Sequence, residues 1–157
     1  MNTPEDARLH TLDVRAGISV STWREAVEAA GSLLVAAGSC TEAYVDAMAA
    51  AVVELGPYMV IAPGVAMPHA RPEAGVIHPG TVVVTLATPV AFGNPANDPV
   101  DLVIAFAAVD KNAHLESLQA ITALLLDEPR LNAVRAATND DELRAAVSGE
   151  PTSTEGH

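Results

Sequence analysis

The sequence predicts a single α/β domain in which a central mixed β-sheet carries helices on both of its faces. With 157 residues, of which 50% are hydrophobic, the chain is long enough for one globular core. Helical patterns fill both ends of the chain, and short apolar, β-branched runs lie between them. Such runs suit strands that are buried on both faces, which requires a layer of helices on each side of the sheet.

The first predicted helix lies within residues 19–39. Thr22 and Glu25 form a capping box, and apolar residues then recur at helical spacing. Gly38 is a suitable stop, whereas Gly31 inside the helix carries a small propensity cost.

Residues 40–56 repeat this pattern, with Thr41 as the cap and Gly56 as the stop. The expected apolar face comprises Tyr44, Val45, Met48, Val52 and Leu55. Because the two helices follow each other so closely, we expect them to pack on the same layer. Three runs then predict strands: YMVIA at 58–62, TVVVTLA at 81–87 and PVDLVIAFAAV at 99–109.

Helical spacing returns at Asn112 and continues to a break at Pro129. The expected apolar stripe of this helix comprises Leu115, Leu118, Ile121, Thr122 and Leu125. Two shorter helices follow within 128–137 and 140–149, the second capped between Thr138 and Asp140.

These elements divide the chain into three parts. We expect an N-terminal lead-in at 1–18, the folded domain at 19–148, and a flexible tail at 149–157.

The charge excludes several classes of function. Eight Lys and Arg residues face 20 Asp and Glu residues, which gives a net charge of −12. A chain with so few cations cannot neutralise phosphates, so we expect neither nucleic acid nor an anionic membrane as a partner. The same charge favours the approach of a positively charged protein.

The chain also carries few signals for export or for cofactors. Its single cysteine, Cys40, and the lack of a secretory leader or a long apolar run indicate a cytoplasmic protein without membrane insertion. Nucleotide-binding glycine motifs and zinc-binding patterns are absent from the sequence, so we expect no cofactor and no metal.

His69 is the first candidate for chemistry. Pro68 stiffens its approach and Pro72 disfavours helix at Arg71, so His69 lies on a rigid, extended segment that leaves a predicted strand. Strand ends are where α/β folds place functional groups. A neutral imidazole is a nucleophile that can accept a covalent group and release it. The alternative is an exposed loop histidine without a role.

His114 is the second candidate, because it lies in the first turn of a predicted helix, where free N–H groups attract an anion. The alternative is a first-turn surface residue. His78 precedes a proline in a turn and is expected to be structural or solvated, and His10 and His157 lie near the termini. The spacing of the histidines does not require a metal. Arg71 can pair with a phosphate or, equally, with Glu73.

Two segments resemble the signatures of a known family. PGVAMPHARPE at 63–73 follows YVDAMAAAVVELGPYMVIA at 44–62, and FGNPANDPVDLVIAFAAVDKNAHLESLQAITALL occupies 92–125. Together they are similar to the IIA component of the bacterial sugar phosphotransferase system, of the mannitol/fructose class and most like its ascorbate-type branch. The resemblance extends from about Ser19 to Val147.

The resemblance implies a phosphocarrier. A phosphorylated histidine carrier protein would donate to His69, and His69 would pass the phosphoryl group to a cysteine of a IIB component. That component would serve a membrane IIC component in the uptake of a sugar or of a sugar acid such as L-ascorbate. His114 would stabilise the phosphoryl oxygens.

One segment departs from the family pattern. Relatives usually carry an Arg-Glu pair after the Ala-Met of the second helix, whereas Met48 is followed here by Ala49, Ala50, Ala51 and Val52. Either Arg71 supplies the missing positive charge, with Lys111 as a second candidate, or the site relies on backbone N–H groups and His114. Two other functions stay open at this point: a regulatory IIA-like protein that signals by phosphorylation-dependent binding, and a binding domain without chemistry.

Overall fold

A five-stranded mixed sheet forms the centre of the molecule, as the sequence predicts. The computed structural model describes residues 11–56 and 59–149. In the order β1-β4-β5-β3-β2, β1 runs parallel to β4, β4 antiparallel to β5, β5 parallel to β3, and β3 antiparallel to β2. The strands are β1 (Thr11–Ile18), β2 (Val60–Ala62), β3 (Val65–Ala66), β4 (Gly80–Val90) and β5 (Val100–Ala107).

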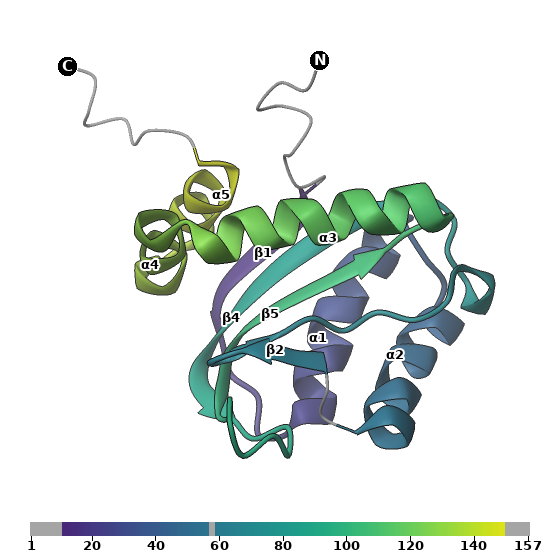
Figure 1. Cartoon of the computed structure of the whole chain (residues 1–157), viewed down its shortest axis with the longest axis horizontal. Coiled ribbons are helices and arrows are strands. Elements are labelled where there is room, and N and C mark those ends of the chain that lie inside the picture. The colour runs from purple at the N-terminus through teal and green to yellow at the C-terminus, as the bar shows by residue number, and fades with distance from the viewer. Residues whose placement is uncertain (1–10, 57–58, 150–157) are drawn as a thin grey trace.

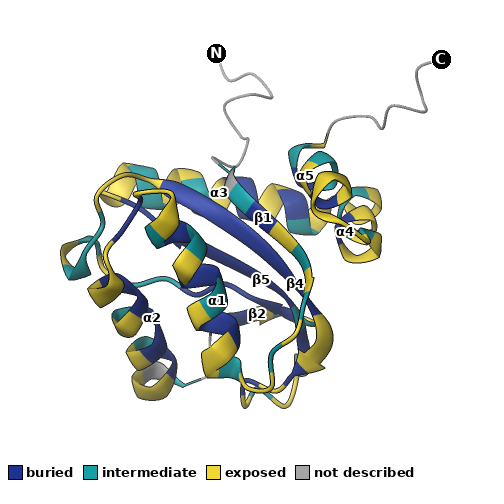
Figure 2. Ribbon diagram, turned by 180° about the vertical axis from the view of Figure 1, so that it is seen from behind, coloured by how far each residue is buried: buried dark blue, intermediate teal, exposed yellow. Residues whose placement is uncertain are grey.

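Helices cover both faces of this sheet (Figures 1 and 2). One layer contains α1 (Trp23–Ala36) and α2 (Glu42–Leu55), and the other contains α3 (Lys111–Leu126), α4 (Glu128–Ala136) and α5 (Asp140–Ser148). A short 3-10 helix, η3 (Pro72–Ala74), lies between β3 and β4. The predicted fold class is therefore confirmed.

The alternation along β5 explains why two separate apolar clusters form. Val103, Ala105 and Ala107 face α1 and α2, whereas Leu102, Ile104 and Phe106 face the other layer. All of these residues are buried, which is why the sequence shows an unbroken apolar run. The sheet thus separates two cores.

The ends of α1 follow the predicted signals. The Thr22 side chain accepts a hydrogen bond from Glu25 N at 3.2 Å, and the Glu25 carboxylate accepts one from Ser21 N at 2.7 Å. At the other end Gly38, with φ of 79°, allows the N–H of Ser39 to reach back to Leu34 O.

Gly31 has a packing role that its propensity does not indicate. It is buried where α1 crosses α2, and a Cβ atom built at this position would lie 2.6 Å and 2.8 Å from the two methyl carbons of Val45. The absence of a side chain therefore allows the two helices to approach closely.

Two strands and one helix face differ from the predicted pattern. The sequence pattern does not predict β1, which lies inside the expected lead-in, or the two-residue β3. The expected stripe of α3 is wrong at Leu115, which is 54% exposed, and at Thr122, which is also exposed. The helix buries Ala120, Ile121 and Leu124 instead, because leucines occur on all sides of it and only the sheet selects the buried face.

Other expectations fall outside the described residues. These are the structure of Tyr58 in the YMVIA run, the tail beyond Gly149, and the surroundings of His10 and His157.

Candidate functional site

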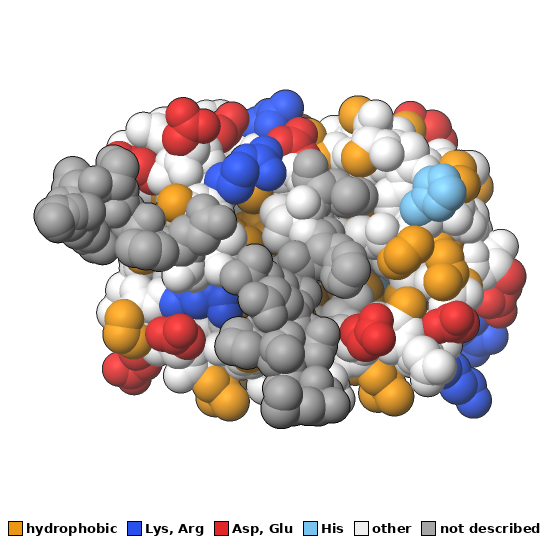
Figure 3. Space-filling view, turned by 90° about the horizontal axis from the view of Figure 1, so that it is seen from above, with side chains coloured by type: hydrophobic (Ala, Val, Ile, Leu, Met, Phe, Trp, Pro, Cys, Tyr) orange, Lys and Arg blue, Asp and Glu red, His pale blue; other side chains and the backbone are white. Residues whose placement is uncertain are grey.

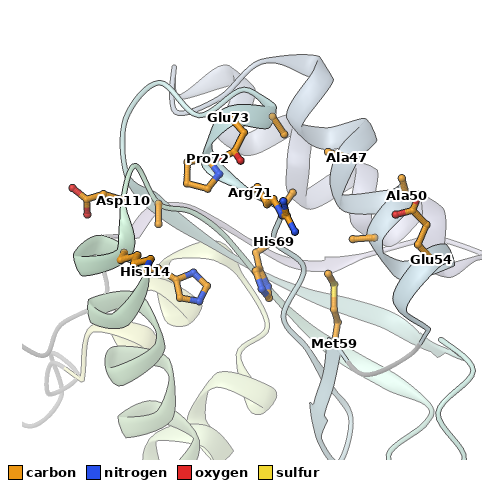
Figure 4. A pocket seen from close by; sticks show the side chains of 15 residues that line it. Ala47, Ala50, Glu54, Met59, His69, Arg71, Pro72, Glu73, Asp110 and His114 are labelled. Carbon is orange, nitrogen blue, oxygen red and sulfur yellow. The ribbon is translucent and has the colours of Figure 1, made fainter.

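A cleft opens beyond the carboxyl-terminal ends of the parallel strands β3 and β5. The chain leaves β3 toward His69 and leaves β5 toward the start of α3, so both connections meet at this end of the sheet. The cleft has a volume of about 800 Å³ and lies between α2, η3 and α3 (Figure 4). His69, Arg71, Lys111 and His114, the four residues singled out in the sequence, all line it.

His69 is held on two sides. Its Nδ1 atom lies 3.0 Å from Met67 O, and its ring stacks on Phe106 with centroids 4.9 Å apart and an angle of 19° between the planes. Burial lowers the pKa of His69, although the bond to Met67 raises it and the neighbouring His114 lowers it further. The imidazole therefore stays neutral to lower pH than an exposed histidine.

The hydrogen bond to Met67 also selects the tautomer of His69. A carbonyl oxygen only accepts hydrogen bonds, so Nδ1 must carry the proton of the neutral ring. The other nitrogen, Nε2, then has a free lone pair.

His114 enters the cleft from the first turn of α3. Its ring centroid lies 5.5 Å from that of His69 and 5.4 Å from that of Phe106. Asp110 caps this helix, because its side chain accepts a hydrogen bond from Ala113 N at 2.9 Å. The three rings therefore form one cluster at the start of a 16-residue helix.

Arg71 and Lys111 line the same cleft from two different segments. Arg71 precedes η3 and extends into the cleft near His69 (Figure 4). Lys111 is the first residue of α3. Both are exposed, and neither forms an ion pair with any residue in the described part of the chain. The alternative pairing of Arg71 with Glu73 is therefore not present here.

Tyr44 forms hydrogen bonds with the backbone next to His69, a role that the sequence pattern does not indicate. Its side chain is fully buried, and its hydroxyl accepts a hydrogen bond from Ala70 N at 3.0 Å. The same hydroxyl lies 2.8 Å from Phe106 O and 3.2 Å from Ala70 O. Sequence reasoning assigns Tyr44 to an apolar helix face, and only the tertiary contacts show where its hydroxyl lies.

Small side chains form the wall of the cleft on the α2 side. Ala47, Ala50 and Ala51 line it together with Glu54, and no Arg or Lys of α2 is among the described lining residues. The positive charges of the cleft therefore come from the η3 and α3 sides.

Neither a metal centre nor a membrane span is found in residues 11–56 and 59–149. No group of three or more His, Cys, Asp or Glu side chains there could hold a metal ion. None of the helices in these residues combines the length and the apolar character needed to cross a bilayer.

Comparison with known proteins identifies the family. Residues 9–149 match the family described as phosphoenolpyruvate-dependent sugar phosphotransferase system, EIIA 2, and the chain belongs to this family. It is thus a phosphotransferase component, as the resemblance implies.

Individual relatives agree with this assignment. The chain is 45% identical to the phosphotransferase IIA component SgcA of Escherichia coli (strain K12), over 87% of this chain and 95% of the relative. It is 42% identical to the ascorbate-specific PTS system EIIA component of the same strain, over 88% and 90%. The IIA subunit in the complex of enzyme IIAMtl with phosphorylated enzyme IIBMtl from Escherichia coli is 29% identical, with a TM-score of 0.77 over 91% of this chain and 99% of that one.

Proposed function

We propose that this protein carries a phosphoryl group on Nε2 of His69, as the IIA component of a phosphoenolpyruvate-dependent transport system. The observation that supports this most directly is the hydrogen bond from Nδ1 to Met67 O, which leaves the lone pair on Nε2. The lowered pKa of His69 adds to it, because only a neutral imidazole is a nucleophile.

Uptake and release are two displacements at phosphorus. The Nε2 lone pair of His69 attacks the phosphorus of a phosphohistidine on the donor protein, and the donor N–P bond breaks with its electron pair returning to the donor nitrogen. Throughout both steps Nδ1 keeps its proton and donates a hydrogen bond to Met67 O. A cysteine thiolate of the acceptor then attacks the same phosphorus, and the electron pair of the Nε2–P bond returns to His69.

The charge of the phosphohistidine requires compensation, because the phosphoryl oxygens carry close to two negative charges on a protein of net charge −12. The ring that keeps its Nδ1 proton offsets only one of them. Arg71, Lys111 and His114 line the cleft around His69 and carry the donors for it. The N-terminus of α3 adds its partial positive charge. In this proposal Arg71 replaces the arginine that relatives carry on the helix corresponding to α2.

The partners follow from the family and from the charge. The donor is a phosphorylated histidine carrier protein, the acceptor is the cysteine of a IIB component, and a membrane IIC component is served indirectly. The similarity to an ascorbate-specific EIIA component supports a sugar acid of the ascorbate type as the transported substrate. Acidic and basic side chains are interspersed on the face seen in Figure 3. The net charge of −12 suits basic surfaces on the partners, and the proposed location is the cytoplasm.

The test is phosphorylation by enzyme I, the carrier protein and labelled phosphoenolpyruvate. The wild-type protein should gain an acid-labile, base-stable phosphate, and His69→Ala and His69→Gln should gain none while remaining folded. His78→Gln is the matched control, because His78 is an exposed loop histidine outside the cleft. Full labelling of His69→Gln would refute the assignment.

Arg71 has its own test. Arg71→Ala should lower the fraction phosphorylated at equilibrium, and Arg71→Lys should restore only part of it, because a point charge lacks the bidentate fork of a guanidinium. Arg24→Ala, which removes an exposed arginine of α1, is the control for net charge. Wild-type behaviour of Arg71→Ala would remove Arg71 from the site.

A further inference from the structure

The register of β3 against β5 continues past the end of the strand as far as His69. Leu102 N donates to Gly64 O at 3.1 Å, and four residues further along both chains Phe106 N donates to Pro68 O at 3.3 Å. Both bonds have the same offset, which places His69 opposite Phe106. In a parallel ladder the next bond after this one joins Ala70 N to Phe106 O.

Tyr44 occupies the position of that next bond. Ala70 N donates to the Tyr44 hydroxyl at 3.0 Å, and the hydroxyl lies 2.8 Å from Phe106 O. A phenol has one proton, and the shorter contact assigns it to Phe106 O and not to Ala70 O at 3.2 Å. The hydroxyl is therefore inserted between the two backbone groups that would otherwise bond directly.

This inserted group keeps its proton under all ordinary conditions. Tyr44 is fully buried, and burial raises the pKa of its phenol to about 12. The neutral hydroxyl consequently accepts a hydrogen bond from Ala70 N and donates one to Phe106 O.

His69 lies between two peptide groups that are both tied to Phe106, one directly through Pro68 and one through the hydroxyl of Tyr44. The inserted oxygen separates the segment that follows β3 from the end of β5 at this point. The imidazole can then stack on the Phe106 ring and at the same time place Nδ1 on Met67 O. The orientation of the ring thus depends on the width of the ladder at this one bond.

We propose that Tyr44 is a positioning residue for phosphoryl transfer, which fixes the tautomer and the direction of the His69 ring without touching the phosphoryl group. This inference rests on the proposed role of His69. In Tyr44→Phe, either the two chains close into a direct bond between Ala70 and Phe106, or both backbone groups stay unpaired. In the first case the peptide of His69 moves relative to the Phe106 ring, and in the second it loses the hydrogen bond that holds it there.

The experiment compares Tyr44→Phe with Ser39→Ala. Ser39 is also buried, and its hydroxyl also donates to a backbone carbonyl, that of His78 at 2.6 Å, but it does not line the cleft. Both variants lose one buried hydroxyl, so a purely structural role predicts the same behaviour for both. The first readout is the ¹⁵N spectrum of the His69 ring across pH, and the second is the rate of phosphorylation by the carrier protein.

We expect the wild-type ring to be in the Nδ1–H form and Tyr44→Phe to show an increased fraction of the Nε2–H form with a changed pKa. Its rate should fall at least about tenfold, the scale on which misplaced reacting groups slow a reaction. Ser39→Ala should match the wild type in both readouts. An unchanged tautomer and a rate within about twofold of wild type in Tyr44→Phe would overturn the proposal.

The spectrum separates this proposal from the proposed function. A wild-type protein that accepts no phosphate refutes the function, whereas the tautomer comparison still decides the role of Tyr44. If Tyr44→Phe does not fold, amide exchange of the wild-type protein decides instead. The Ala70 N–H should then exchange slowly, and rapid exchange would show that the hydroxyl does not hold it.

Discussion

Adding a methyl group at Gly31 tests the close contact between α1 and α2. Alanine is the better helix former by about 1 kcal/mol, so propensity alone predicts that Gly31→Ala stabilises the protein. The structure predicts the opposite, because the new methyl group would lie 2.6 Å and 2.8 Å from the two methyl carbons of Val45. Ordinary carbon contacts lie near about 3.5–4.0 Å, so the helices must separate by roughly 1 Å.

The expected magnitudes follow from these contacts. Overpacking by one methyl group costs about 1–3 kcal/mol, which leaves Gly31→Ala about 1 kcal/mol less stable than wild type after the gain in propensity. Val45 is 5% exposed, and Val45→Ala should cost about 2 kcal/mol through lost burial and a cavity. In the double variant both close methyl carbons are gone, and the methyl group added by Gly31→Ala meets only the Cβ atom that remains at position 45, 3.2 Å away, which a small shift relieves. The total loss should therefore be only about 1 kcal/mol rather than the additive sum of about 3 kcal/mol.

The assay is urea denaturation of the wild type, both single variants and the double variant, followed by circular dichroism. Ser32→Ala is the matched control, because Ser32 is the exposed neighbour in the same helix. This variant introduces alanine without a clash and removes only an exposed hydrogen bond, from the Ser32 hydroxyl to Ala29 O at 2.8 Å. A Gly31→Ala protein more stable than wild type, together with additive free energies of unfolding in the double variant, would refute the close contact.

Three further outcomes are expected. His114→Ala should still be phosphorylated but should transfer to the IIB cysteine with a barrier about 1–3 kcal/mol higher, and equal transfer rates would leave His114 without a role. The lowered pKa of His69 means that the unfolded chain binds more protons than the native state below the ordinary value of 6.5. The free energy of unfolding should therefore fall as pH decreases through that value, and denaturation at several pH values should show a shallower fall in His69→Gln. Arg135 donates to Pro63 O at 2.7 Å and pairs with Asp101 at 3.3 Å, so Arg135→Ala should lose about 1 kcal/mol of stability in the same assay.

The sequence predicts the elements whose signals are local. The capping pair of Thr22 and Glu25 and the stop at Gly38 are correct because each depends on residues a few positions apart. The strand β3 has only two residues, and its existence depends on pairing with β5, which no local pattern records. For the same reason Leu115 and Thr122 are placed wrongly on the buried face of α3.

In the candidate site, too, the residues with local sequence signals are predicted and the tertiary contacts between them are not. His69 is a candidate from the sequence because prolines flank it, and His114 is one because it lies in the first turn of a predicted helix. The geometry that joins them could not be predicted, since it depends on Phe106 and on the hydroxyl of Tyr44, which belong to apolar clusters on opposite sides of the sheet.

The hydrogen bond between Tyr44 and Phe106 joins the two cores, because Tyr44 belongs to the α1–α2 cluster and Phe106 to the cluster on the opposite side of the sheet. Proteins open locally in cooperative units, and each helical layer here packs on an apolar cluster of its own. Detachment of either layer removes part of the support of His69, even while the other layer stays folded. His69, the proposed phosphoryl acceptor, is therefore in its described geometry only in molecules where both units are closed. On the proposed function, the extent of its phosphorylation would report the integrity of the whole domain.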